Sequence, residues 1–220
     1  MSDPSYPDGV RPSAPTALDP DMLVPLPRAF YDRPVLEVAT DAIGSILVHR
    51  SADGIAAGRI VEVEAYRGPE DLASHSAGGK RTKRNEAMWG PPGHVYMFLL
   101  YGVNWAFNLV TGKEGEPHAV LVRAVEPLPP FQLMADRRGM APEDREITNG
   151  PGKLCAALGL DGDHYGVDLC ATAQLFLALG RRGEVARSPR INIDYAGDWV
   201  DKPWRFYERG NRYVSVKPRD

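Results

Sequence analysis

Two acidic side chains on one predicted strand are the first candidates for chemistry in this chain. Apolar and polar residues alternate strictly over 59–66, which is typical of a half-buried β-strand. Alternation assigns three apolar side chains to the core-facing side: Val61, Val63 and Ala65. It assigns two carboxylates and an aromatic ring, with one apolar residue, to the other side: Ile60, Glu62, Glu64 and Tyr66. A carboxylate in a cleft can act as a general base on water. A strand face whose charges point into solvent is the alternative.

The segment 67–93 is rich in Gly, Pro and polar residues and is predicted to form a long loop. Loops of this length in a compact domain are usually functional or mobile. His75 could hold a water molecule or a phosphate here, and a surface position is the alternative. Four bases follow without an intervening acid: Lys80, Arg81, Lys83 and Arg84. Such a run can neutralise DNA phosphates, whereas the alternative is a merely solvated loop.

Strands are predicted over 95–100 and 105–110, and the four residues 101–104 between them indicate a hairpin. Phe98 and Tyr101 lie close to its tip. Aromatic residues in strands usually belong to the core. An aromatic ring at an exposed tip beside a basic loop would instead suit stacking on a base or insertion between base pairs.

Several other motifs lack the spacing that their chemistry requires. Residues 150–154 (Gly-Pro-Gly-Lys-Leu) do not have the Gly-x-x-x-x-Gly-Lys-Ser/Thr pattern of nucleotide hydrolysis, although Lys153 near a helix N-terminus could contact a backbone phosphate. No Gly-x-Ser-x-Gly segment occurs, which argues against a serine hydrolase. The five histidines show no ligand spacing, so no metal site is expected. Cys155 and Cys170 are expected to be reduced thiols.

Charge is distributed unevenly along the 220 residues, whose formal net charge is -3. The first 27 residues contain four acids and one base, so the remainder is neutral, and the global charge neither supports nor excludes a nucleic-acid partner. Residues 1–26 are predicted to be a disordered tail, and residues 27–220 one domain. No secretory signal and no apolar run of about 18 to 20 residues is present, so we expect a cytoplasmic protein without a membrane partner.

Regular elements are expected on both sides of the candidate strand. Helices are predicted over 33–44 and 130–138 and after residue 152. The remaining predicted strands cover 46–48, 119–125, 190–194 and 205–207. This order predicts an α+β fold: a single domain with a mixed, largely antiparallel β-sheet, surrounding helices and a protruding β-hairpin.

Taken together, these segments resemble the alkyladenine (3-methyladenine) DNA glycosylase family, in a bacterial form. The resemblance extends from about residue 27 to 217 and is specific because many short matches occur in order. The matching segments are 59–71 (Arg-Ile-Val-Glu-Val-Glu-Ala-Tyr-Arg-Gly-Pro-Glu-Asp), 73–76 (Ala-Ser-His-Ser), Arg84-Asn85, Met88, Pro92-Gly93, Leu100-Tyr101-Gly102, Asn108, 121–124 (Leu-Val-Arg-Ala), 150–155 (Gly-Pro-Gly-Lys-Leu-Cys) and 205–207 (Arg-Phe-Tyr).

The resemblance implies a monofunctional glycosylase that flips alkylated or deaminated purines out of duplex DNA, without metal or cofactor and as a monomer. Glu64 would be the general base, and His75 would help to bind the attacking water. Arg123 would support this water or a neighbouring phosphate. Tyr66 and Phe98 would sandwich the flipped base, with His75 near its edge. Asn108 would exclude the exocyclic amine of guanine. Tyr101 would fill the gap in the duplex.

Two departures from the family pattern stand out. Phe98 occupies a stacking position where Tyr is usual, and Lys83 stands where Pro is expected. Two rival functions also remain open at this point. Glu62 and Glu64 could be the acid and base of a carbohydrate hydrolase, or the chain could be a noncatalytic nucleic-acid-binding module.

Overall fold

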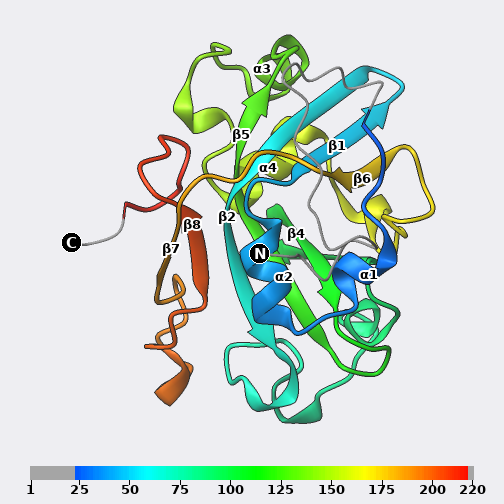
Figure 1. Cartoon of the computed structure of the whole chain (residues 1–220), viewed down its shortest axis with the longest axis vertical. Helices are drawn as coiled ribbons and strands as arrows, with labels where there is room; N and C mark the ends of the chain where they lie inside the picture. The colour runs from blue at the N-terminus through cyan, green and yellow to red at the C-terminus, as the bar shows by residue number, and fades with distance from the viewer. Residues whose placement is uncertain (1–22, 218–220) are drawn as a thin grey trace.

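The computed structural model describes residues 23–217 (Figure 1). Most of the expected tail, 1–26, therefore lies outside the described residues. Its last part is described: Leu23 and Leu26 are buried, and the Leu26 amide donates a hydrogen bond of 2.7 Å to the carbonyl of Leu177. Within residues 23–217, no helix has the length and apolar character that a membrane span requires.

The described chain contains α-helices, short 3₁₀ turns and one antiparallel sheet, which confirms the expected α+β class. The helices are α1 (Arg28–Tyr31), α2 (Val35–Ala42), α3 (Gln132–Arg138) and α4 (Pro151–Leu158). The strands are β1 (Ile46–Ser51), β2 (Gly54–Arg67), β3 (Val95–Leu100), β4 (Asn104–Thr111), β5 (His118–Leu128), β6 (Leu175–Ala178), β7 (Val185–Ser188) and β8 (Arg205–Glu208).

Strand β2 is the central strand of the sheet and pairs with three others. The order is β3-β4-β5-β2-β1-β6, and β8 also pairs with β2 and carries β7 on its other side. Strands β1 and β8 pair with β2 over 54–59 and 62–64, respectively, while β5 accompanies most of its length. Strand β8 therefore lies directly beside the part of β2 that carries both carboxylates, with β7 on its outer side (Figure 1).

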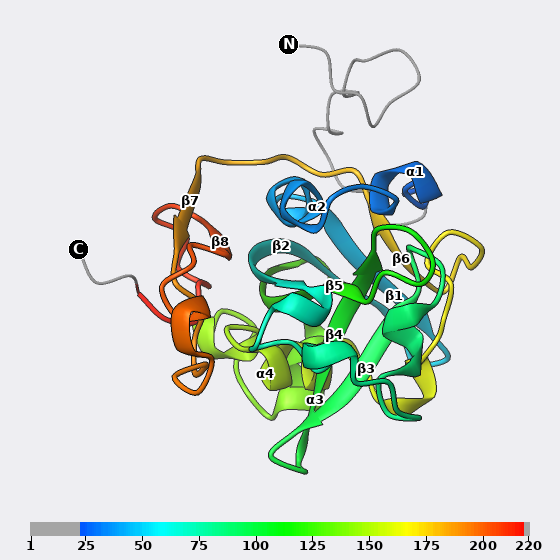
Figure 2. The ribbon, with the colours of Figure 1, turned by 90° about the horizontal axis from the view of Figure 1, so that it is seen from below.

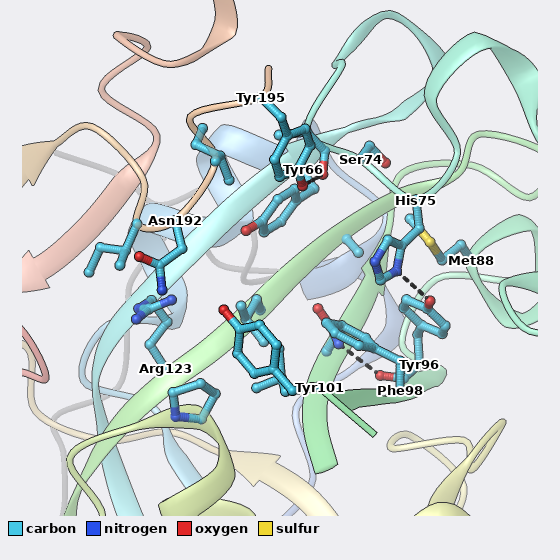
Figure 3. Close-up of a pocket in the computed structure, with 18 residues that line it drawn as sticks. Tyr66, Ser74, His75, Met88, Tyr96, Phe98, Tyr101, Arg123, Asn192 and Tyr195 are labelled. Atoms are coloured by element: carbon cyan, nitrogen blue, oxygen red, sulfur yellow. Dashed lines mark hydrogen bonds between the residues drawn. The ribbon is translucent and has the colours of Figure 1, made fainter. Parts of the chain in front are cut away.

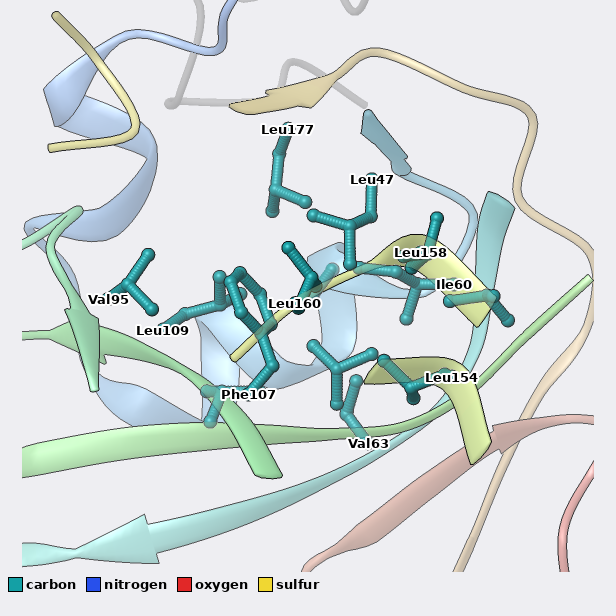
Figure 4. Close-up of a cluster of buried hydrophobic side chains, with 14 of the residues drawn as sticks. Leu47, Ile60, Val63, Val95, Phe107, Leu109, Leu154, Leu158, Leu160 and Leu177 are labelled. Atoms are coloured by element: carbon teal, nitrogen blue, oxygen red, sulfur yellow. The ribbon is translucent and has the colours of Figure 1, made fainter. Parts of the chain in front are cut away.

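One large apolar cluster lies between the curled sheet and the helices α2 and α4 (Figure 4). Four buried residues of α2 recur at helical spacing and form its apolar face: Val35, Val38, Ala39 and Ala42. Helix α4 begins with Pro151, whose missing N–H costs nothing in the first turn, and ends at Gly159 in the left-handed conformation (φ 72°). Both helices are therefore set by local sequence signals and by burial.

Most of the elements expected from the sequence are present, and one is wrong. The predicted strand over 190–194 is an irregular loop, because Asn192 has a positive φ of 58° and the Ile191 amide donates to the Glu64 carboxylate instead of to a strand. The hairpin of β3 and β4 is confirmed, and it projects from the body of the protein (Figure 2). Its tip is formed by residues 101–103.

The strict alternation expected along 59–66 is interrupted. The pairing of β2 with β5 shifts register between Ile60 and Glu62 and again between Glu62 and Val63. The first shift makes Val61 an extra residue on β2. As a result, Ile60 packs in the main core with Val63 and not on the side of the carboxylates, as the alternation predicted.

Candidate active site

A row of directly paired residues crosses five strands and forms the floor of the site. The pairings run from Tyr96 to Asn108, from Asn108 to Leu121, from Leu121 to Glu64 and from Glu64 to Arg205. Residues paired across antiparallel strands lie on the same face of a sheet. The sheet therefore places Glu64 of β2 on the same face as residues of β3, β4, β5 and β8.

Glu64 is fully buried, so the alternative of a solvated strand face is wrong. Its Oε2 accepts hydrogen bonds from the Tyr66 hydroxyl at 2.9 Å and from Arg123 Nη1 at 3.2 Å. Its Oε1 accepts a bond from the Ile191 amide at 2.8 Å. An ionised carboxylate has about four acceptor positions, so three partners leave one unused.

Arg123 lies at the second register shift, where β5 carries one residue more than β2. Bulges of this kind commonly redirect a side chain beside an active site. Its guanidinium bridges the two carboxylates, with Nε 3.1 Å from Glu62 and Nη1 3.2 Å from Glu64. Burial opposes its charge, but the neighbouring Glu64 and Glu62 carboxylates raise the pKa of Arg123 above its usual value.

A cavity of about 280 Å³ opens in front of the three residues that donate hydrogen bonds to Glu64 (Figure 3). Its volume is near the lower end of the roughly 300–1,000 Å³ found for small-molecule sites. Tyr66, Arg123 and Ile191 all line the cavity and all donate to Glu64, which lies directly behind them. Other polar and aromatic residues that line the cavity include His75, Tyr96, Phe98, Tyr101, Asn108, Asn192 and Tyr195.

Aromatic rings form much of the cavity wall. Tyr66 comes from β2, and the Arg190 guanidinium lies 4.8 Å from its ring centroid. Burial, followed by the charge of Glu64, raises the pKa of Tyr66 well above 10, so its hydroxyl remains a donor. Phe98 comes from β3 and lies edge-to-face against His75, with 4.5 Å between ring centroids. The structure thus brings together both predicted stacking residues.

His75 joins the aromatic wall, with Nδ1 2.7 Å from the Tyr96 hydroxyl (Figure 3). His75 as a whole residue is exposed, but desolvation of the ring where it packs against Tyr96 and Phe98, together with the positive charges of Arg84 and Lys80, lowers the pKa of His75 to about 4. The imidazole is consequently neutral at physiological pH, with one nitrogen as a donor and the other as an acceptor.

Asn108 is buried in the cavity floor. Its side-chain nitrogen donates to the carbonyls of Tyr96 at 3.0 Å and Ala106 at 3.4 Å. These two backbone bonds fix the orientation of the amide and hence the shape of the floor.

Tyr101 lies at the rim of the cavity and at the tip of the hairpin. Its side chain is 86% exposed and its backbone is left-handed, with a φ of 52°. The alternative of a core tyrosine is therefore wrong.

The predicted phosphate-binding cations divide into two groups. Arg81 forms two hydrogen bonds with Glu86, at 2.5 and 3.0 Å, and Lys153 contacts Glu146 at 3.3 Å. Among the described residues, no carboxylate pairs with the other three cations, all of them exposed: Lys80, Lys83 and Arg84. The Arg84 guanidinium lies 5.8 Å from the Phe98 ring centroid, and Lys83 and Arg84 line a neighbouring hollow that shares Phe98 with the cavity.

The loop 189–197 closes one side of the cavity with Ile191, Asn192 and Tyr195, although the sequence predicted a strand over 190–194. Its apolar alternation resembled a strand, and no local signal marked the positive φ at Asn192. A buried ion pair fixes this loop, because Arg190 donates to Asp71 at 2.5 and 2.8 Å. Tyr96 was also missed, although it alternates with Phe98 along β3.

The two-carboxylate alternative conflicts with the contacts of Glu62. This side chain is fully buried and accepts four hydrogen bonds, from Arg123, Arg205 and both the amide and hydroxyl of Ser215. Three of these bonds end on Oε1 and one on Oε2, and neither Arg205 nor Ser215 lines the cavity. Glu62 is therefore placed to hold Arg123 and not to exchange a proton with a substrate. Within residues 23–217, no cluster of three or more His, Cys, Asp or Glu side chains could hold a metal ion.

The fold and the site define an α+β protein with an aromatic-walled cavity in front of one buried carboxylate. The family model "Methylpurine-DNA glycosylase (MPG)" matches residues 29–212. Curated relatives named "Putative 3-methyladenine DNA glycosylase" are 46% identical in Methanocella arvoryzae and 46% identical in Desulfitobacterium hafniense. A relative of the same name in Bacillus cereus is 45% identical. These matches cover 87% of this chain and 96%, 98% and 98% of the relatives, respectively. The chain therefore belongs to the methylpurine-DNA glycosylase family and is a hydrolase of N-glycosidic bonds in DNA.

The lowered pKa of His75 predicts a specific loss of stability in acid. Below about pH 6.5 the unfolded chain binds a proton at His75, whereas the folded protein excludes it until about pH 4. The free energy of unfolding should therefore fall between these values, and it should fall less in His75→Gln. Urea unfolding at pH 7 and pH 5 measures this difference. His49 and His118, whose pKa values are also lowered, are present in both proteins. An equal loss in both proteins would contradict the lowered pKa of His75.

Proposed function

We propose that this enzyme flips alkylated or deaminated purines out of duplex DNA and hydrolyses the N-glycosidic bond with a water molecule activated by Glu64. The substrate class includes 3-methyladenine, 7-methylguanine and hypoxanthine. The observation that carries the proposal is the cavity itself, which has aromatic rings at its sides and a buried carboxylate behind one wall.

Glu64 is suited to hold a single water molecule. Its three donors occupy three acceptor positions, and each of these donors also faces the cavity. A water molecule that reaches Glu64 from this side would donate to the remaining position, which is on Oε1. The proton that leaves the water during attack passes to the carboxylate, as in general-base catalysis.

One carboxylate is sufficient for this chemistry. A purine alkylated on its ring carries positive charge and leaves readily, and the sugar becomes oxocarbenium-like. Water then attacks from the face opposite the departing base, as in inverting glycosidases. Ionised Glu64 also stabilises the developing positive charge. Protonation of the leaving group becomes important only for neutral bases such as hypoxanthine.

Selectivity arises from flipping and from the shape of the cavity. Extruding a base costs a few kcal/mol, and least for weakly paired or damaged bases. The flipped base would stack between Tyr66 and Phe98, with neutral His75 at its edge. Because its orientation is fixed by two backbone bonds, Asn108 would reject the exocyclic amine of guanine. Phe98 lacks a hydroxyl and so contributes only its apolar face.

Base release from a duplex with a single hypoxanthine tests the function directly. A binding module would retain the duplex without releasing the base, and a carbohydrate hydrolase would do neither. Release of free hypoxanthine with the DNA strand left uncut is the expected result. Strand cleavage coupled to release would contradict the monofunctional mechanism.

Replacing the general base should abolish most of the activity without abolishing binding. Glu64→Gln keeps the shape of the side chain but removes its basicity, and a positioned general base is worth about 10²- to 10⁴-fold in rate. We expect a loss of this size in single-turnover excision, with binding to damaged DNA retained. Glu126→Gln is the matched control, because Glu126 lies on β5 outside the cavity and pairs with Arg59. Near-normal excision by Glu64→Gln would exclude the assignment.

The unpaired lysines of the basic loop should contribute to salt-dependent binding. Each phosphate contact contributes about -0.9 to the slope of log affinity against log salt concentration. The double variant Lys80→Ala, Lys83→Ala should therefore flatten the slope by about 1 to 2, equally for damaged and intact duplexes. Lys113→Ala is the control, because this exposed lysine follows the end of β4 opposite the hairpin tip. An unchanged slope would mean that the loop is only solvated.

Tyr101 should contribute to flipping and not to folding. Because its side chain is 86% exposed, Tyr101→Ala should change the free energy of unfolding by no more than about 0.5 kcal/mol. Excision from a paired duplex should be slow, since nothing would fill the gap, and the defect should shrink for a lesion opposite a gap or in a mismatch. Phe131→Ala, which removes an exposed ring outside the cavity, is the control. Equal defects in paired and mismatched duplexes would contradict a wedge role.

A further inference from the structure

We propose that Glu62 is a positioning residue for the catalytic carboxylate, and that the C-terminal segment 214–216 completes the active site by holding Glu62 in place. This inference rests on the proposed role of Glu64. It assigns a function to a buried carboxylate that the hydrolytic mechanism does not use, and to a segment more than 150 positions away from it in the sequence.

The contacts of Glu62 come from three separate elements. From β5, Arg123 donates through Nε at 3.1 Å; from β8, Arg205 donates through Nε at 2.7 Å. From the C-terminal segment, Ser215 donates through its amide at 2.5 Å and through its hydroxyl at 2.9 Å. A further hydrogen bond holds the C-terminal segment against β8, because Arg205 Nη2 also donates to the carbonyl of Val216.

These contacts determine how Arg123 meets Glu64. A free guanidinium prefers a bidentate pair with one carboxylate. Glu62 engages Nε of Arg123, so Arg123 contacts Glu64 through Nη1. A bidentate pair would occupy two acceptor positions of Glu64, and with Tyr66 and Ile191 it would leave none for water. Glu62 thus keeps the water position of Glu64 open.

Glu62 also balances the charge around Glu64. Two buried carboxylates face two buried arginines, and neither carboxylate would be tolerated unpaired. If the charge of Glu62 were removed, Arg123 and Arg205 would both act on Glu64, and its ionised form would be favoured further. The ionisable groups that surround Glu64 are Glu62 and Tyr66 on β2, Arg123 on β5, Arg205 on β8, Asp71 after β2, and Arg190 and Tyr195 on the loop 189–197.

The experiment measures single-turnover excision of hypoxanthine as a function of pH in full-length Glu62→Gln, with duplex binding measured in parallel. We expect the plateau rate to fall about 10- to 100-fold, because displacement of a catalytic group by about 1 Å can cost about 10²-fold. The acidic limb of the profile should move to lower pH by about one unit or more. Binding of damaged duplex should remain unchanged.

Three further variants separate this role from general damage to the fold. Glu208→Gln is the matched control, because Glu208 pairs with Arg59 between the same two strands outside the cavity; its profile should be parental. Glu62→Asp keeps the charge but shortens the side chain, so its rate should fall while its acidic limb stays in place. Ser215→Ala removes one bond to Glu62, and its rate should fall about fivefold, as expected for one hydrogen bond. If Glu62→Gln does not fold, Glu62→Asp and Ser215→Ala provide the test.

The outcomes distinguish the inference from the proposed function. If the parental protein releases no hypoxanthine, the proposed function fails. If the parent is active and Glu62→Gln loses rate without a shift of the acidic limb, Glu62 is only structural and the inference is overturned. Parental rates in both Glu62→Asp and Ser215→Ala would overturn it as well.

Discussion

The structure depends above all on the pairing of charges that are buried on one face of β2. Glu62 and Glu64 are both fully buried, and removing carboxylates from water costs several kcal/mol each unless partners replace the lost hydration. Arg123 and Arg205 supply the opposite charges, and the amides of Ile191 and Ser215 supply further donors. These partners come from β5, β8, the loop 189–197 and the C-terminus. One electrostatic requirement therefore brings together segments that are remote in the sequence.

The sheet meets this requirement through its irregularities. In a regular pairing of β2 with β5, each residue would have one directly opposite partner. No extra side chain of β5 would then be available to bridge Glu62 and Glu64. The register shift at Arg123 provides that extra residue, and the shift at Val61 keeps Ile60 in the core. The ion pair of Arg190 and Asp71 then holds the loop 189–197 against the loop that follows β2. Because Arg190 also lies against the Tyr66 ring, the same contact supports a wall of the cavity.

The site combines features that suit a neutral or cationic heteroaromatic base better than a sugar. Aromatic faces and a neutral imidazole bind a planar ring, and they offer few of the hydrogen bonds that hydroxyl groups need. Only one of the two carboxylates, Glu64, accepts all its hydrogen bonds from residues that line the cavity, which is compatible with hydrolysis of an activated leaving group. The exposed hairpin tip lies at the rim of the same cavity, and Arg84 of the basic loop lies 5.8 Å from the ring centroid of Phe98, which lines it. A noncatalytic module would gain nothing from burying Glu64 at this position.

The sequence by itself determined the α+β class, the helices α2 and α4, the hairpin, and the common face of Glu62, Glu64 and Tyr66. These features follow from local periodicity, turn residues and proline positions, which act over a few residues. Only the tertiary structure decided which donors surround Glu62 and Glu64, that residues 190–194 form a loop, and that the C-terminal segment reaches the site. The alternation over 190–194 predicted a strand because the local sequence does not show where the Ile191 amide donates its hydrogen bond. Its acceptor is the Glu64 carboxylate, about 130 residues away. The partners of buried charges depend on which strands pair over long distances in the sequence. A register shift of one residue changes which side chain meets each carboxylate.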